Sequence, residues 1–344
     1  MSATPQKIVA TWLFVMAAMV FAMVVLGGVT RLTQSGLSIT EWWPVSGWLP
    51  PLNDAAWDKV FTLYRTSPEY KKLNLGMTLA EYKAIFWLEY VHRLWGRTIG
   101  VAFLVPLVLF IARGWVGRPL AWRLGGLFVL GGLQGGLGWY MVKSGLVDHP
   151  DVSQYRLAAH LGLALLIFAA ILWTAMELMR PPAAADIPAP AARGLRRGTL
   201  WLLALVFLTQ LSGAFVAGLD AGLIYNTFPL MDGRLLPEEA FRLTPFYLNF
   251  FETIALVQFD HRLLATATVV ATAWLWWRAQ GPPLTGRQRR AVNLLAAAAL
   301  VQASLGIATL LLVVPVPLAA LHQAGAVALL AAGLWLAHAL GRGD

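Results

Sequence analysis

The chain has 344 residues, of which 58% are hydrophobic and only 12% are charged, and its mean hydropathy is positive. This composition excludes an ordinary soluble globular protein and predicts an integral membrane protein. Because the chain has no cysteine, disulfides, thiolate metal sites and iron–sulfur clusters are excluded, so redox chemistry would need histidine ligands or a bound cofactor.

The first apolar stretch, "IVATWLFVMAAMVFAMVVLGGV", is about 22 residues long and has no cleavage site of small residues after it. We therefore expect a retained first span rather than a signal peptide. No Arg- and Ser-rich transit segment precedes it, which favours a bacterial inner membrane. Further stretches also reach the roughly 20 residues that a span requires. The predicted spans are 8–28, 92–111, 120–142, 157–179, 198–218, 261–279, 289–313 and 317–340.

Arginines are concentrated in the connections after the second, fourth and sixth spans, where only Asp186 opposes them. By the positive-inside rule these connections and both termini are cytoplasmic, whereas the longer segments 30–90 and 219–260 lie outside. The net charge of +9 therefore reflects membrane topology, and no nucleic-acid partner is expected.

The two halves of the chain resemble each other. The matching features, in the same order, are "GLSITEWWP" with "AGLIYNTFP", His92-Arg93 with His261-Arg262, Gln134 with Gln302, and His160 with His322. The offsets are 169 residues for the first histidines, 168 for the glutamines and 162 for the second histidines, which indicates a duplication. We predict an all-α integral membrane protein with eight transmembrane helices, arranged as two pseudo-symmetric four-helix bundles with extended outer loops. The predicted domains are an N-terminal bundle, 1–182, a cytoplasmic proline-rich linker, 183–197, and a C-terminal bundle, 198–344.

Four histidines are expected within about two turns of the outer ends of the even-numbered spans: His92, His160, His261 and His322. In an up-down-up-down bundle the second and fourth helices are diagonal, so these side chains would face each other in pairs. Two opposed imidazoles suit the axial positions of a haem iron. A single one would more simply be an interfacial polar residue, and zinc or copper would need further ligands that neither half offers at fixed spacing. We therefore predict that the four histidines are metal ligands, with one haem site in each half, towards the periplasmic side.

Arginines follow the first histidine of each half: Arg93 and Arg97 in the first, Arg262 in the second. Their guanidinium groups could pair with haem propionates near the outer surface. Contact with lipid headgroups explains them equally well.

A difference between the halves lies three residues before each first histidine, where Glu89 in the N-terminal half corresponds to Gln258 in the C-terminal half. Positions i and i+3 share a helix face, so a carboxylate is expected beside the first haem site only. This asymmetry favours chemistry in the first half and storage or transfer of electrons in the second. The alternative is an interfacial glutamate in water.

Five motifs carry a resemblance to a known family: "GGVTRLTQSGLSITEWWP", "EYVHRLWGR", "HLGLALL", "FDHRLLA" and "LHQAGAVALLA". Over nearly its whole length the chain resembles the heme A synthase family, in its alphaproteobacterial and mitochondrial branch. The resemblance implies an oxidoreductase that converts the C8 methyl group of haem O to the formyl group of haem A by successive hydroxylations. It also implies that Glu89, His92 and His160 form the catalytic site for substrate haem, whereas His261 and His322 hold a haem b cofactor.

The resemblance implies partners as well: a heme O synthase as supplier, an aa3-type cytochrome oxidase or its assembly factors as recipient, and an electron acceptor of unidentified nature. An oligomer is compatible with the sequence. Two other functions stay open, namely a diheme b-type membrane protein that only relays electrons, and a haem carrier. A relay would keep two equivalent haems permanently, whereas the enzyme would exchange one of them.

Overall fold

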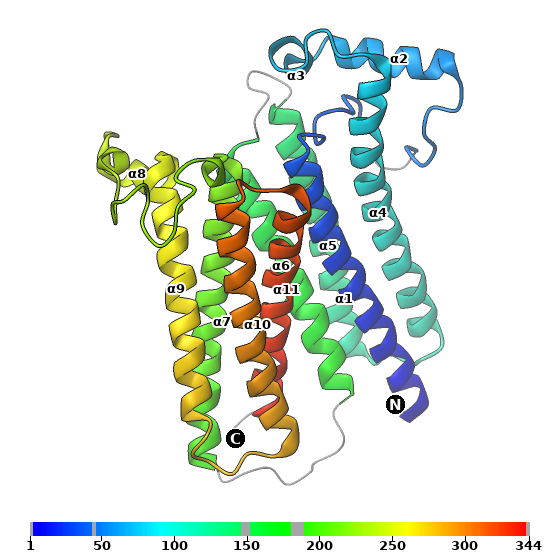
Figure 1. The fold of residues 1–344 in the computed structure, drawn as a ribbon. Coiled ribbons are helices and arrows are strands. Elements are labelled where there is room, and N and C mark those ends of the chain that lie inside the picture. The colour runs from blue at the N-terminus through cyan, green and yellow to red at the C-terminus, as the bar shows by residue number, and fades with distance from the viewer. Residues whose placement is uncertain (1–2, 43–45, 146–151, 180–188, 342–344) are drawn as a thin grey trace. The chain divides into compact units, whose positions relative to one another are not determined.

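The computed structural model describes residues 3–42, 46–145, 152–179 and 189–341. Over these residues the fold is helical, and the only β-type pairing among them is an isolated bridge between Met231 and Arg234. The long helices are α1 (Ala3–Leu32), α4 (Leu79–Ala112), α5 (Arg118–Gly145), α6 (Gln154–Leu178), α7 (Ala189–Gly218), α9 (Ile254–Arg278), α10 (Gly286–Leu311) and α11 (Val316–Ala339) (Figure 1). The short elements are α2 (Asp54–Arg65), α3 (Pro68–Lys72), η1 (Ala221–Leu223), η2 (Glu238–Phe241), η3 (Phe246–Leu248) and α8 (Asn249–Glu252).

Seven helices in the described part of the chain are long and apolar enough to cross a membrane: α1, α4, α6, α7, α9, α10 and α11. The prediction of an all-α, multi-pass membrane protein is therefore confirmed. Helix α5 coincides with the predicted span 120–142 but is not one of the seven. Its sequence is rich in glycine, which lowers its hydropathy, and the eighth span stays a prediction.

Helix α4 begins well before the apolar stretch that marks the predicted span 92–111. Thr78 and Glu81 form a capping box, in which the Glu81 carboxylate accepts from the Thr78 N–H (2.7 Å) and the Thr78 hydroxyl accepts from the Glu81 N–H (3.3 Å). His92 therefore lies more than three turns inside the helix, since each turn takes about 3.6 residues. The expectation that every one of the four histidines lies within about two turns of a helix end is wrong for His92, because the cap and not the lipid boundary sets where α4 begins.

Residues 15–167 form one compact unit. In it, α2 and α3 pack on the first turns of α4 through aromatic side chains. The cluster consists of Trp57, Tyr64, Tyr70, Tyr82, Phe86 and Tyr90. The rings of Tyr64 and Tyr82 are stacked, with centroids 4.9 Å apart, and such pairs contribute about 0.5–1.5 kcal/mol beyond their buried area. Burial raises the pKa of the Tyr64 phenol well above its usual value, so the phenol stays neutral and accepts a hydrogen bond from the Asn74 side chain (2.7 Å).

Residues 3–14 and 168–341 form a second compact unit. Within it α7 packs against α9 and α11, and α10 packs against the same two helices. Helices α9 and α11 therefore lie diagonally across a closed ring of four (Figure 1). Residues 189–197, predicted as part of the linker, lie in the first turns of α7, whereas 180–188 fall outside the described residues. The domain bounds 1–182 and 198–344 stay predictions.

Candidate functional site

Each of the four histidines lies against a glycine of a neighbouring long helix. A Cβ atom added to Gly27 in α1 would lie 3.3 Å from Nε2 of His92, and one added to Gly138 in α5 would lie 3.0 Å from Cε1 of His160. In the second unit, a Cβ atom added to Gly213 in α7 would lie 3.2 Å from Cε1 of His261, and one added to Gly306 in α10 would lie 2.8 Å from Cε1 of His322. These distances are at or below the limit of van der Waals contact, so a larger residue would displace the imidazole.

Sequence reasoning missed these glycines, although a signal for two of them existed. Gly138 follows Gln134 by four residues and Gly306 follows Gln302 by four residues, so glutamine and glycine share a helix face in both halves. The same spacing recurs at the position that the predicted repeat matches, so the sequence did contain a signal for this shared helix face.

The two glutamines bind the second histidine of each half. The side-chain amide of Gln134 donates to the main-chain carbonyl of His160 (2.9 Å), and Gln302 donates to that of His322 at the same distance. The same amide nitrogens lie 3.2 and 3.1 Å from Nδ1 of the respective imidazoles. The Oε1 atoms of both glutamines are buried without a hydrogen-bond partner among the described residues, which leaves one polar acceptor beside each imidazole.

The structure brings the predicted histidine pairs together. His92 and His160 lie within electrostatic range of each other in the unit 15–167, and His261 and His322 do so in the second unit. All four side chains keep part of their surface exposed, although they lie within long apolar helices. Among the described residues, no group of three or more side chains could hold a metal ion alone. Paired imidazoles held against glycines therefore fit a haem, whose iron needs only two protein ligands.

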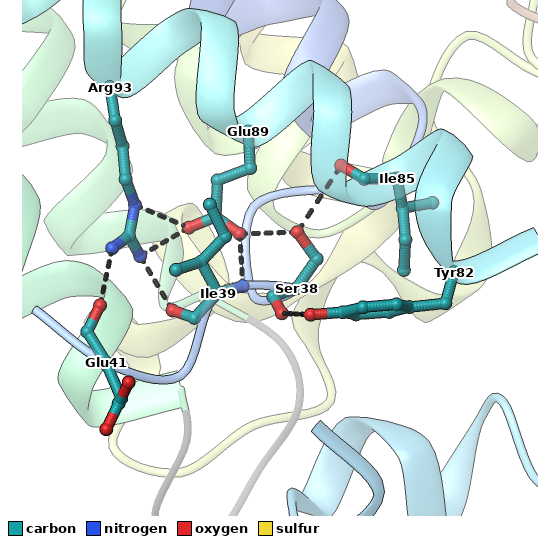
Figure 2. Close-up of polar contacts among 7 residues, drawn as sticks. All are labelled: Ser38, Ile39, Glu41, Tyr82, Ile85, Glu89 and Arg93. Carbon is teal, nitrogen blue, oxygen red and sulfur yellow. Dashed lines mark hydrogen bonds and ion pairs between the residues drawn. The ribbon is translucent and has the colours of Figure 1, made fainter. Parts of the chain in front are cut away.

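Glu89 is 2% exposed, and four hydrogen bonds fill its carboxylate (Figure 2). Oε1 accepts from Nε (2.9 Å) and Nη2 (2.5 Å) of Arg93. Oε2 accepts from the Ser38 hydroxyl (2.7 Å) and from the Ile39 N–H (2.7 Å). The alternative of an interfacial glutamate in water is therefore wrong, since α4 and the segment after α1 enclose the group.

Arg93 holds the same segment from the other side (Figure 2). Its guanidinium donates to the main-chain carbonyls of Ile39 (2.8 Å) and Glu41 (2.9 Å), and lies over the Trp42 ring at 5.4 Å. All three of its nitrogens thus contact protein groups. Arg97 lies one turn further along α4 and is partly buried. The pairing of Arg93 and Arg97 with haem propionates stays a prediction.

Gln258 and Arg262 form the equivalent arrangement in the second unit. Gln258 is 2% exposed, its Nε2 donates to the carbonyls of Ala221 (2.6 Å) and Ile224 (2.5 Å), and its Oε1 accepts from Arg262 (2.8 Å). Arg262 also donates to the carbonyl of Tyr225 (2.6 Å). A propionate contact of Arg262 likewise stays a prediction.

The comparison of the two units explains the Glu89/Gln258 difference physically. The segment after α1 turns donors towards its helix, namely the Ser38 hydroxyl and the Ile39 N–H, which bond one oxygen of Glu89. Arg93 donates to the other oxygen, so both atoms must accept, as only a carboxylate can. The segment after α7 turns carbonyls towards its helix, and these require an amide N–H. The sequence shows the exchange of residue but not this reversal of polarity.

Known proteins match the chain along almost its full length. The profile of the COX15-CtaA family, described as cytochrome oxidase assembly protein, matches residues 10–334. The Heme A synthase of Nitrosospira multiformis is 56% identical over 337 residues, which cover 98% of this chain and 94% of that protein. The Heme A synthase of Rhodospirillum centenum is 53% identical over 343 residues (98% and 90%), and Heme A synthase COX15 of Bos taurus is 47% identical over 347 residues (99% and 84%). The chain therefore belongs to the heme A synthase family.

Proposed function

We propose that this chain is a heme A synthase, which oxidises the C8 methyl group of haem O to the formyl group of haem A for cytochrome oxidase. The observation that carries the proposal is the repeated site: in each unit two imidazoles lie within electrostatic range, each against a glycine. The heme A synthases that match nearly the whole chain support the assignment. Two equivalent sites alone would also suit a relay or a carrier, whereas the buried carboxylate in one of them favours an enzyme.

In this proposal His92 and His160 bind the iron of the substrate haem, and His261 and His322 bind a haem b cofactor. When bound, haem b supplies a redox centre that takes up electrons and passes them on to an acceptor of unidentified nature. The apolar helices around the histidines exclude water and suit the farnesyl tail of haem O. Two four-helix bundles, with α5 as the eighth span, would supply this environment twice.

Glu89 is the residue that we propose for proton handling. It precedes His92 by three residues on α4, so the two side chains share a helix face. Oxidation of a methyl group releases protons, and a carboxylate held beside the site is a group that accepts one. The hydrogen bonds from Ser38 and Ile39 fix the position of the carboxylate, and Arg93 balances its charge.

The proposed setting is a bacterial inner membrane with both termini in the cytoplasm and both haem sites towards the periplasm. The arginines between the spans support this orientation. A heme O synthase would deliver the substrate, and an aa3-type cytochrome oxidase or its assembly factors would receive the product.

The pigments of the purified protein test the function. After co-expression with a heme O synthase, we expect haem B together with haem A and its alcohol intermediate, identified by chromatography and mass spectrometry. Expression without the heme O synthase is the control and should yield haem B without haem A. A protein that carries only haem B and haem O, with no alcohol or aldehyde derivative, would contradict the enzyme and favour a relay or a carrier.

Gly138→Ala should lower the yield of haem A by about 10–100-fold, the usual loss when the surroundings of a metal ligand are disturbed. A methyl group there would lie 3.0 Å from Cε1 of His160 and turn the ring. Gly135→Ala is the matched control, three residues away on α5 with nothing within 4 Å of the added atom. Both changes favour the helix by about 1 kcal/mol, so the difference between them reports on the imidazole. Equal haem A yields from the two variants would contradict the role of Gly138.

A further inference from the structure

The four imidazoles do not face their glycines in the same way. His160, His261 and His322 turn Cε1 towards the neighbouring glycine, whereas His92 turns Nε2 (3.3 Å) and Cδ2 (3.8 Å) towards Gly27. His92 and His261 occupy matching places in the two halves, whereas Gly27 and Gly213 do not. The side chains beside each ring therefore distinguish the two sites.

A hydroxyl group holds the His261 ring. Ser212 donates its only hydroxyl proton to the main-chain carbonyl of Thr209 (2.8 Å), so its oxygen accepts from Nδ1–H of His261 at 2.9 Å. Because the Thr209 carbonyl can only accept and takes the Ser212 proton, Nδ1 of His261 carries its own proton, and Nε2 keeps the lone pair that binds a metal.

The matching place in the other half carries no such group. In the register that matches "GLSITEWWP" with "AGLIYNTFP", Ser212 corresponds to Gly27. A glycine has no side chain that could hold an imidazole. Within the part of the chain that the structure describes, the His92 ring has no hydrogen-bond partner.

We propose that Ser212 is a positioning residue that makes the His261/His322 site the one that retains its haem, whereas glycine at the matching position 27 gives His92 no such hold. The inference rests on the proposed function, since an enzyme that takes up haem O and gives up haem A must exchange one haem and keep the other. A hydrogen bond to Nδ1–H fixes the ring and makes Nε2 a stronger donor to iron. A single serine-to-glycine difference between the two halves thus distinguishes a permanent site from an exchangeable one.

The test compares variants of the full-length holoenzyme in detergent, with excess apomyoglobin as the haem acceptor. Ser212→Ala should release haem B about 10–100-fold faster than the parent, and its reduction potential should rise because the ligand is a weaker donor. Ser212→Thr keeps the hydroxyl and should restore the slow release and the potential. Ser304→Ala, at an exposed serine of α10 whose hydroxyl bonds only its own helix, is the matched control and should behave as the parent. Unchanged release and potential in Ser212→Ala would overturn the inference.

If the parent makes no haem A, the proposed function fails whatever the variants do. If the parent makes haem A but Ser212→Ala retains haem B, only the inference about Ser212 fails.

Discussion

Protein with His92→Ala should form no haem A, a loss of at least about 100-fold, yet should still purify with one haem B. The reason is that His92 and His160 are within electrostatic range of each other in one unit, whereas His261 and His322 lie in the other. If His92 and His160 hold the substrate haem as proposed, removing one imidazole takes an axial ligand from that iron only. Haem content per protein, with identification of each haem by mass spectrometry after co-expression with a heme O synthase, measures the effect.

The reciprocal variant, His261→Ala, is the control. It should lose haem B, and because the redox partner of the reaction is then missing, it should also form no haem A. The two histidine variants thus share the loss of product but differ in the haem that remains. If His92→Ala also lost haem B, the assignment of one haem to each histidine pair would be wrong.

Glu89→Gln should abolish formation of the aldehyde while both histidine pairs still bind haem. The change removes the negative charge that balances Arg93, in a pair whose side chains are 9% and 3% exposed, and it sets an amide against the donors of Ser38 and Ile39. Loss of one partner from such a buried pair costs about 3 kcal/mol. We therefore also expect a lower unfolding temperature, measured in detergent beside the haem analysis.

Two further variants separate proton handling from the anchoring of the segment after α1. Ser38→Ala removes one hydrogen bond to the carboxylate but keeps its charge, so it should retain most haem A formation while losing about 1.5–3 kcal/mol of stability. Gln258→Glu sets a carboxylate against the carbonyls of Ala221 and Ile224 and should destabilise the second unit without affecting the first. A Glu89→Gln protein with full activity would contradict the proposed role. A Ser38→Ala protein as inactive as Glu89→Gln would assign Glu89 to anchoring instead.

The apolar stretches predicted most of the long helices, because the cost of placing polar groups in hydrocarbon makes a span visible in composition alone. Their limits were less accurate where a helix continues outside the apolar stretch. Helix α4 begins at Leu79 because a capping box and an aromatic cluster support turns that the hydropathy pattern does not mark. The glycine-rich α5 shows the opposite case, a long helix whose composition is a weak signal for a span.

The sequence by itself determined the membrane class, the family resemblance and the four histidines, and it predicted a duplication, since composition, spacing and residue type are properties of the chain. The tertiary structure alone showed which glycine faces each imidazole, that Glu89 and Gln258 bind segments of opposite polarity, and that a hydroxyl holds His261 but not His92. Those contacts join different helices, or a helix and a distant segment. They depend on how each helix is rotated about its axis and how closely its neighbours approach, which packing decides and residue order does not record.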